Sequence, residues 1–243
     1  MATVSDHYEQ HLAPVYSWLV GGFDEAIARG QGELAEVELL GRDGAGYAVD
    51  LGAGFGMHAV PLARQGWKVL AIDTSAMLLE ELRAQNDRGQ VATVQDDLLR
   101  FPHYLSGRPD AILCMGDTLT HLPDVGAVRT LFSSVSEHLP PGGRFLLSFR
   151  DYSRALEGPD RFILVKGDDS RVFTCSLEYR EDSVRVHDIL HERSEGGWRM
   201  RVSAYEKLRL GPDWVQRELE SLGLRVRAEA GLSGLVRIVA VPR

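Results

Sequence analysis

Three glycines and two aspartates near the start of the chain have the spacing of a nucleotide site. Gly52, Gly54 and Gly56 alternate behind Asp50, where a short apolar run turns into an amphipathic one. Glycine lets a ligand approach the backbone closely, and a helix that follows offers unsatisfied N–H donors. The next apolar run ends in Asp73, whose carboxylate could accept both hydroxyls of a ribose. These residues predict a nucleotide-sized ligand.

The spacing of these glycines separates two classes of nucleotide ligand. Turns that bind dinucleotides carry G-x-G-x-x-G, in which the third glycine lets the helix pack closely on the strand. Here the order is G-x-G-x-G behind an acidic residue. A nicotinamide-dependent oxidoreductase would share the fold, but this spacing argues against it.

The elements that must position these residues alternate as strand and helix through residue 150. This alternation predicts an α/β fold, with a doubly wound and mostly parallel sheet of seven strands. Ligands bind such sheets at the carboxyl ends of the strands, where the loop after residue 115 should also lie. We expect the strands at 47–49, 67–72, 91–94, 110–115, 144–149, 224–230 and 236–241.

The pattern changes after the fifth strand. Four segments with two-residue alternation are separated by turn residues, which is typical of an antiparallel meander. We therefore expect residues 159–209 to form an antiparallel β insertion within a single domain spanning 1–243. The insertion could also join copies of the chain into a homo-oligomer. The four predicted strands are 161–165, 172–179, 184–191 and 198–208.

Composition limits the partners of the chain. It carries a net charge of −8 and no dense Lys/Arg cluster, whereas a nucleic-acid enzyme needs a basic track against phosphate. We expect a small-molecule substrate and no nucleic acid. No apolar run approaches the roughly 20 residues of a membrane helix. The N-terminus also lacks a signal pattern, so we expect no membrane contact and a cytoplasmic location.

No metal site is expected. Cys114 and Cys175 are too few and too isolated for a zinc site or a disulfide framework. On an alternating strand, two nearby histidines share one face and two acidic residues share the other, so a solvated sheet face is the better interpretation. The residues concerned are His187, Asp188, His191 and Glu192.

The glycine turn, together with Asp73, resembles motif I and the acidic residue of the class I S-adenosylmethionine (SAM) methyltransferases. The resemblance spans about residues 47–150 and implies a SAM site, with S-adenosylhomocysteine as product. In this family an aspartate after the third strand accepts from the adenine amino group. Asp96 and Asp97 are both available, and the usual register prefers Asp97; both could instead be solvated loop carboxylates. The implied cofactor residues are Tyr16, Asp50, Gly52, Ala53, Gly54, Asp73, Thr74, Asp96, Asp97, Leu98, Met115 and Gly116.

Two later motifs are similar to the glycine and sarcosine N-methyltransferase branch, which carries G-N-S-F-A-H-L-P-D and H-R-N-Y where this chain has GDTLTHLPD and FRDY. The resemblance implies that Arg150 grips a substrate carboxylate, which suits a planar guanidinium. The Asn of the first motif is Asp117 here. An aspartate would favour a cationic amine or a hydroxyl donor and oppose a carboxylate. Sugar and antibiotic amines are therefore alternatives to glycine.

The segment before the first strand should form helices at 5–18 and 23–40, broken by Gly21-Gly22. Its apolar residues recur at helical spacing and could simply pack on the sheet. In the family, such helices fold over the cofactor and supply a tyrosine. The resemblance thus implies that residues 1–40 form a lid, with Tyr16 as first choice and Tyr8 as second, the latter also facing the substrate.

The implied reaction is transfer of the SAM methyl group to a nitrogen, or an oxygen, of a small acceptor. Holding a lone pair in line with the methyl–sulfur bond can supply roughly 7–11 kcal/mol. An amine must lose a proton first, and Asp117 or His121 could accept it or orient the acceptor. His121 could instead be structural, and Arg150 an ion-pair partner. A non-catalytic SAM-binding module is the alternative, which these polar residues disfavour.

Overall fold

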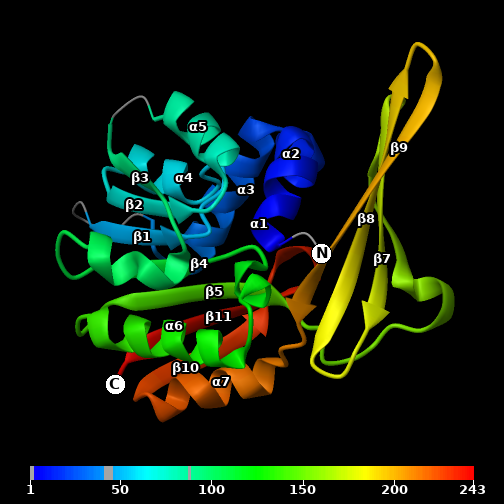
Figure 1. Cartoon of the computed structure of the whole chain (residues 1–243). Coiled ribbons are helices and arrows are strands. Elements are labelled where there is room, and N and C mark those ends of the chain that lie inside the picture. Colours follow the sequence, from blue (N-terminus) through cyan, green and yellow to red (C-terminus); the bar gives the residue numbers. More distant parts are fainter. Residues whose placement is uncertain (1–2, 41–45, 87–88) are drawn as a thin grey trace.

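A seven-stranded sheet forms the centre of the molecule, in a computed structural model that describes residues 3–40, 46–86 and 89–243 (Figure 1). The strand order is β10-β11-β5-β4-β1-β2-β3, and β11 runs antiparallel to both neighbours while the other pairs are parallel. The predicted doubly wound, mostly parallel sheet is confirmed. Its strands are β1 Tyr47–Leu51, β2 Lys68–Asp73, β3 Val91–Gln95, β4 Ala111–Cys114, β5 Arg144–Arg150, β10 Leu224–Ala230 and β11 Leu235–Pro242.

The inner strands of this sheet contribute to two hydrophobic layers. In β1, Ala48 packs in one core with α3, α4 and α5, whereas Val49 and Leu51 pack in the other with α6 and α7. Because helices cover both faces, an inner strand such as β4 is buried along its whole length. These helices are α3 Phe23–Glu36, α4 Ala59–Arg64, α5 Ala76–Ala84, α6 Val125–His138 and α7 Pro212–Ser221.

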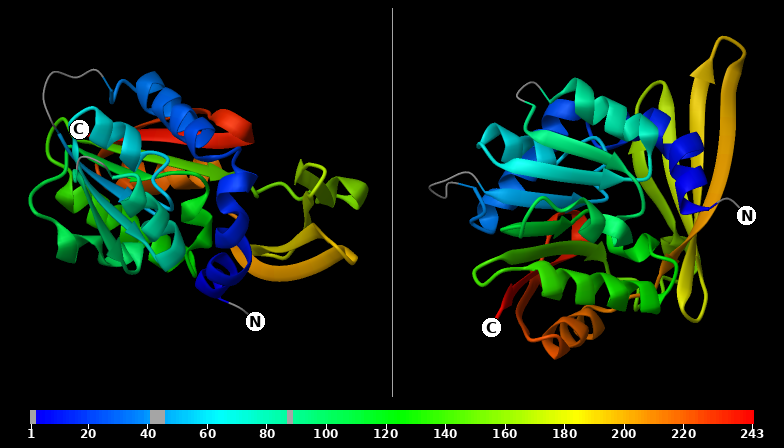
Figure 2. Two further views of the ribbon diagram at one scale, coloured as in Figure 1. Left: turned by 90° about the horizontal axis from the view of Figure 1, so that it is seen from above. Right: turned by 60° about the vertical axis from the view of Figure 1, so that its left-hand side comes forward.

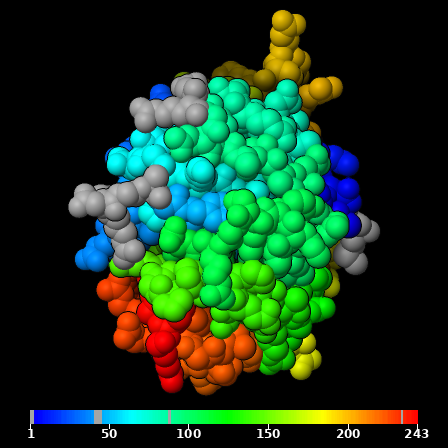
Figure 3. Space-filling view, turned by 90° about the vertical axis from the view of Figure 1, so that its left-hand side faces the viewer, coloured from blue at the N-terminus to red at the C-terminus, as the bar shows by residue number. Residues whose placement is uncertain are grey.

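The antiparallel insertion lies between β5 and α7 in the sequence, as predicted. Its strand order is β6-β7-β8-β9, and every neighbouring pair is antiparallel. The sheet stands beside the central one, and the β8–β9 hairpin projects beyond the rest of the molecule (Figures 1 and 3). The strands are β6 Phe162–Gly167, β7 Arg171–Tyr179, β8 Ser183–Ser194 and β9 Gly197–Leu208.

The two faces of β9 differ from what their residue types suggest. Trp198, Met200 and Val202 lie on the outer face and are 51%, 63% and 53% exposed. The opposite face carries Tyr205 and Lys207, which are buried. Alternation in the sequence predicts that a strand has two faces, but it does not say which face the rest of the chain will cover.

The interpretation of the β8 side chains as a solvated face is wrong for one residue. Asp188 is 3% exposed and its Oδ2 lies 3.0 Å from Nε2 of the buried His7. His187 and Glu192 do pair near the surface, with Glu178 and with Arg171. Within the described ranges, no group of three or more His, Cys, Asp or Glu side chains could hold a metal ion.

The N-terminal helices lie between the two sheets (Figures 1 and 2). Leu12 packs with Phe173 and Leu190 of the insertion, and the hydroxyl of Ser17 donates to Glu81 of α5. Glycines with positive φ at 21 and 22 separate these helices from α3, which confirms the predicted break. The π-helical turn was not predicted. The segments are α1 Val4–His7, the π-helix η1 Tyr8–Leu12 and α2 Ala13–Leu19. Among the described residues, no helix has the length and apolar character needed to cross a membrane.

Candidate active site

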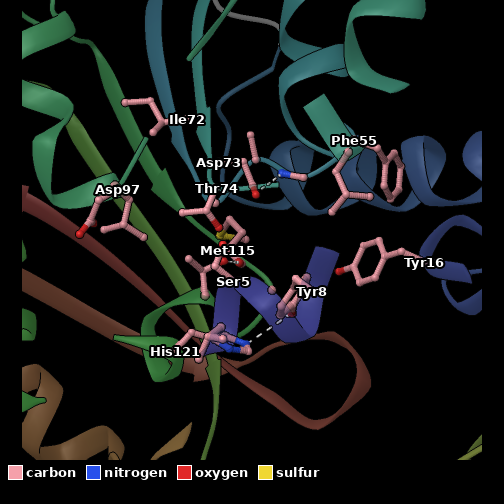
Figure 4. Close-up of a pocket in the computed structure, with 18 of the residues that line it drawn as sticks. Ser5, Tyr8, Tyr16, Phe55, Ile72, Asp73, Thr74, Asp97, Met115 and His121 are labelled. Carbon is pink, nitrogen blue, oxygen red and sulfur yellow. Dashed lines mark hydrogen bonds between the residues drawn. The ribbon is translucent and has the colours of Figure 1, made fainter. Parts of the chain in front are cut away.

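A cavity of about 400 Å³ opens at the carboxyl ends of the central strands, under the N-terminal helices (Figure 4). Its size is that of a small-molecule site, and its place is where ligands bind to open α/β sheets. Most of the residues predicted for the site line it together. They are Tyr8, Tyr16, Gly52, Ala53, Gly54, Asp73, Thr74, Asp96, Asp97, Leu98, Met115, Gly116 and His121.

The glycine turn after β1 is held tightly against the end of β2. The N–H groups of Gly52 and Ala53 donate to the carbonyl of Ile72 at 2.8 and 3.1 Å. Gly52 has a φ of +74°, and a Cβ there would lie 2.4 Å from Thr118 Cγ2. Only glycine fits this position without moving Thr118. The turn therefore presents bare backbone to the cavity.

Asp73 is anchored in the cavity wall by backbone N–H groups on both of its oxygens. Its Oδ2 accepts from the N–H of Gly54 and its Oδ1 from the N–H of Ser75, both at 2.8 Å. Burial raises the pKa of Asp73, although these N–H donors act in the opposite direction. Each carboxylate oxygen has a further acceptor site, so the group could still accept two hydroxyls of a ribose.

The two aspartates after β3 have different partners. Asp96 accepts from the hydroxyl of Tyr104 and the N–H of Asp97, and it pairs with Arg100 at 3.1 Å. Asp97 is exposed, and one of its oxygens caps the 3₁₀-helix η2 (Leu98–Tyr104). Because Asp96 already has several donors, Asp97 stays the predicted acceptor for an adenine amino group.

Asp50 lies beneath the turn and does not line the cavity. It is 2% exposed on the α4 side of the sheet, where it accepts from the N–H of Ala59. Its Oδ2 has no hydrogen-bond partner among the described residues. Burial raises the pKa of Asp50 to about 6. The first N–H of α4 therefore points to this carboxylate rather than to a ligand, and Asp50 supports the turn from below.

The prediction of Asp117 as a catalytic or substrate-binding carboxylate is not supported by its position. Asp117 does not line the cavity, and its Oδ2 lies 2.5 Å from Lys207 Nζ. Its Oδ1 accepts from the Arg150 N–H at 2.9 Å and the Thr120 hydroxyl at 3.0 Å. Burial tends to raise the pKa of Asp117, but Lys207 and the donors to it hold that pKa below its usual value. Both oxygens are committed to the protein.

The predicted carboxylate clamp is also displaced from the cavity. Arg150 is exposed at the end of β5, and its side chain lies beside Gly234. Its backbone N–H donates to Asp117 Oδ1 at 2.9 Å. The short FRDY motif could not reveal this, because the direction of the side chain depends on the partners around the end of the strand.

Two tyrosines and His121 lie together at one end of the cavity (Figure 4). Tyr8 OH lies 3.4 Å from His121 Nε2, and the two tyrosine rings are 6.2 Å apart. Burial lowers the pKa of His121 to about 3, so the imidazole is neutral at physiological pH. Burial raises the pKa of the Tyr8 and Tyr16 hydroxyls, which therefore stay protonated. This end offers neutral donors and acceptors.

The side chains of the cavity fit a nucleoside that carries a positive charge. Its acidic lining residues are Asp73, Asp96 and Asp97, and no Lys or Arg of the described chain lines it. His58 also lines it and pairs with Glu33 at 2.7 Å. A sulfonium is attracted to such a wall, whereas the pyrophosphate of a dinucleotide is repelled. At Gly116, a Cβ would project into open space, so the backbone is accessible there.

Sequence reasoning missed the residues that the insertion contributes to the site. Tyr205 stacks on His121, with ring centroids 5.5 Å apart and planes 4° apart, and Lys207 pairs with Asp117. The sequence showed only that Lys207 follows Tyr205 by two positions, so that both side chains lie on the same face of the strand. Long-range pairing of that kind cannot be read from local spacing.

Part of the chain is similar in sequence to known methyltransferases. Residues 48–143 match a family model described as a methyltransferase domain. The glycine/sarcosine N-methyltransferase of Halorhodospira halochloris is 31% identical over 160 residues, which are 63% of this chain and 58% of that protein. The chain thus spans little more than half the length of this relative.

Two solved structures are similar over nearly the whole chain. The CcbJ methyltransferase from Streptomyces caelestis has a TM-score of 0.78 at 21% identity, covering 97% of this chain and 98% of the other. CalS10, an amino pentose methyltransferase from Micromonospora echinaspora, has a TM-score of 0.75 at 19% identity, covering 95% and 96%. At these identities the likeness shows the fold. Residues 48–143 thus match a methyltransferase domain, and the whole chain has the fold of class I SAM-dependent methyltransferases.

Proposed function

We propose that the chain transfers the methyl group of SAM to a nitrogen, or an oxygen, of a small-molecule acceptor by in-line displacement, with S-adenosylhomocysteine as product. The observation that carries the proposal is one cavity with an anchored acidic residue, Asp73, in its wall and with the neutral polar side chains of Tyr8, Tyr16 and His121 at one end. When bound, SAM supplies an electrophilic methyl group. The protein must hold that group and the acceptor in line and exclude water.

The part of the cavity wall with Asp73 and Asp97 would hold the nucleoside. Asp73 would accept the ribose hydroxyls, while Asp97 and the N–H of Leu98 would recognise the adenine edge. Met115 and the bare backbone at Gly116 would pack along the ligand. The carboxylates would also offset the positive charge of the sulfonium.

The end of the cavity with Tyr8 and His121 would orient the acceptor. A neutral His121 can accept a hydrogen bond, and Tyr8 can donate one. With a pKa of about 3, this imidazole is a weak base toward an ammonium group. The acceptor should therefore arrive as a free amine, and His121 would orient its lone pair rather than deprotonate it.

The position of Arg150 and Asp117 outside the cavity bears on the acceptor class. Without a clamp for a carboxylate, an amine that lacks one fits better than glycine. The similar proteins include a glycine/sarcosine N-methyltransferase and an amino pentose methyltransferase. We propose an amine of the second kind, on a sugar or similar polyol. A nicotinamide-dependent oxidoreductase is disfavoured because the lining carries no Lys or Arg among the described residues.

We also propose that the chain acts as one unit in which the N-terminal helices form a lid and the insertion joins two copies. The outer face of the insertion supports the second point. Five exposed apolar side chains lie on that face, because the register of the strands places their positions on the same side of the sheet. They are Phe162, Leu164, Trp198, Met200 and Val202. The net charge of −8 opposes a nucleic-acid partner. A cytoplasmic location stays a prediction.

The proposal can be tested by incubating the purified chain with methyl-labelled SAM and panels of aminosugars, free amino acids and sugar alcohols. Labelled product from an aminosugar, without label on glycine, is the expected result. Label on glycine but not on aminosugars would overturn the acceptor class, and absence of transfer to every panel while SAM binds would favour a binding module.

A further inference from the structure

A buried ion pair links the insertion sheet to the loop that carries His121. Lys207 Nζ lies 2.5 Å from Asp117 Oδ2, and the two side chains are only 10% and 9% exposed. Lys207 belongs to β9, whereas Asp117 follows β4, 90 residues earlier. Asp117 has a φ of +95°, which is unusual for a residue other than glycine. The bonds to Lys207, Arg150 N–H and Thr120 hold it in that conformation.

The same strand fixes the ring of His121. Tyr205 precedes Lys207 by two positions and therefore shares its face of β9. The Tyr205 and His121 rings are nearly parallel, with centroids 5.5 Å apart. The Lys207 ammonium lies 5.6 Å from the centroid of the Tyr205 ring and 5.7 Å from that of Tyr152. One strand thus supplies both a stacking surface for His121 and a positive charge near it.

The charges around His121 come from three directions. Burial is the strongest influence that lowers the pKa of His121, and the Lys207 ammonium adds to it, while the Asp117 carboxylate acts in the opposite direction. The protonated form of His7 would also lower it. The titratable and charged groups facing His121 are Asp117 from its own loop, Lys207 and Tyr205 from β9, and His7 and Tyr8 from the N-terminal helices.

We propose that Lys207 is a positioning residue that neutralises Asp117 and so keeps His121 in the cavity as an uncharged imidazole. An unpaired Asp117 carboxylate would favour an imidazolium beside it. An imidazolium has no ring lone pair with which to accept a hydrogen bond, and it would repel both a sulfonium and a cationic acceptor. This inference rests on the proposed function for the importance of His121, although its test does not need activity.

The test is an NMR titration of the imidazole nitrogens of His121 from pH 5 to 8, without ligands, with the signals assigned by comparison with His121→Gln. In the unaltered protein, we expect a neutral imidazole throughout. In Lys207→Met, we expect protonation with a midpoint inside this range, which is at least a hundredfold gain in proton affinity. Lys207→Arg keeps the charge and should behave like the unaltered protein.

The double variant Asp117→Asn/Lys207→Met separates charge from packing. It removes both charges, so His121 should be neutral again, whereas a merely structural role of Lys207 would leave the single and double variants alike. A neutral His121 in folded Lys207→Met, or equal protonation in the two variants, would overturn the proposal. If Lys207→Met does not fold, Lys207→Gln makes the same test, because its amide can still donate to Asp117. Failure of methyl transfer would count against the proposed function alone.

Discussion

Replacing Asp50 with asparagine should stabilise the protein in a manner that depends on pH. Asp50 is 2% exposed, and burial raises its pKa from 3.8 to about 6. One pKa unit corresponds to about 1.4 kcal/mol, so the ionised carboxylate costs the folded state about 3 kcal/mol relative to the unfolded chain. Asp50 lies beneath the glycine turn that we propose to hold the cofactor, so the destabilised residue supports the cofactor site.

The effect of pH on stability has a definite direction, because folding raises the pKa of Asp50. Because the folded protein binds the proton more tightly, the contribution of Asp50 to stability is fully present below about pH 4. It is lost as the pH rises through about 6. Asparagine does not titrate, so the stability of Asp50→Asn relative to the unaltered protein should rise by about 3 kcal/mol between pH 4 and 7 and then level off. The loss or gain of a single amide contact adds only a constant.

The assay is urea unfolding followed by circular dichroism at a series of pH values from 4 to 8. Asp110→Asn serves as the control: Asp110 directly precedes β4, is exposed and accepts from the N–H of Tyr47 at the start of β1. A difference in the free energy of unfolding that stays flat, or falls, as the pH rises for Asp50→Asn would refute the reasoning.

Two further predictions concern the cofactor and the assembly. Asp73→Ala should weaken SAM binding by about 1.5–3 kcal/mol, as expected for lost hydrogen bonds to a charged group, and calorimetry giving an unchanged affinity would remove the ribose assignment. Trp198→Glu combined with Met200→Glu places charges on the exposed face of the insertion and should convert a dimer into monomers in light scattering. An unaltered protein that is already monomeric would contradict the proposed interface.

The sequence allowed the scaffold of the site to be predicted because its signals are local. Alternating apolar and amphipathic runs locate the parallel strands along the chain, and the glycine turn and Asp73 lie at the carboxyl ends of β1 and β2. Tyr8 and Tyr16 came from family resemblance, and both line the cavity. Here residue type and spacing were enough, since the backbone itself places these groups.

The side-chain partners in and around the site could not be predicted, because they depend on contacts between distant segments. Asp117 was expected to bind the substrate or accept its proton, but it forms an ion pair with Lys207, 90 residues later. Arg150 was expected to clamp a carboxylate, yet it lies at the exposed end of its strand. Asp188 was expected on a solvated face and is instead buried against His7. In each case the partner lies far along the chain, and a strand pattern cannot say which of its faces will be covered.

The central claim is that the cavity holds SAM, and calorimetric titration of the purified chain with SAM, S-adenosylhomocysteine and NADH tests it most directly. We predict micromolar binding of both adenosyl compounds and none of NADH, because the cavity joins a ribose acceptor with a lining of negative charge. Binding of NADH alone, or of none of the three to the folded protein, would contradict the account.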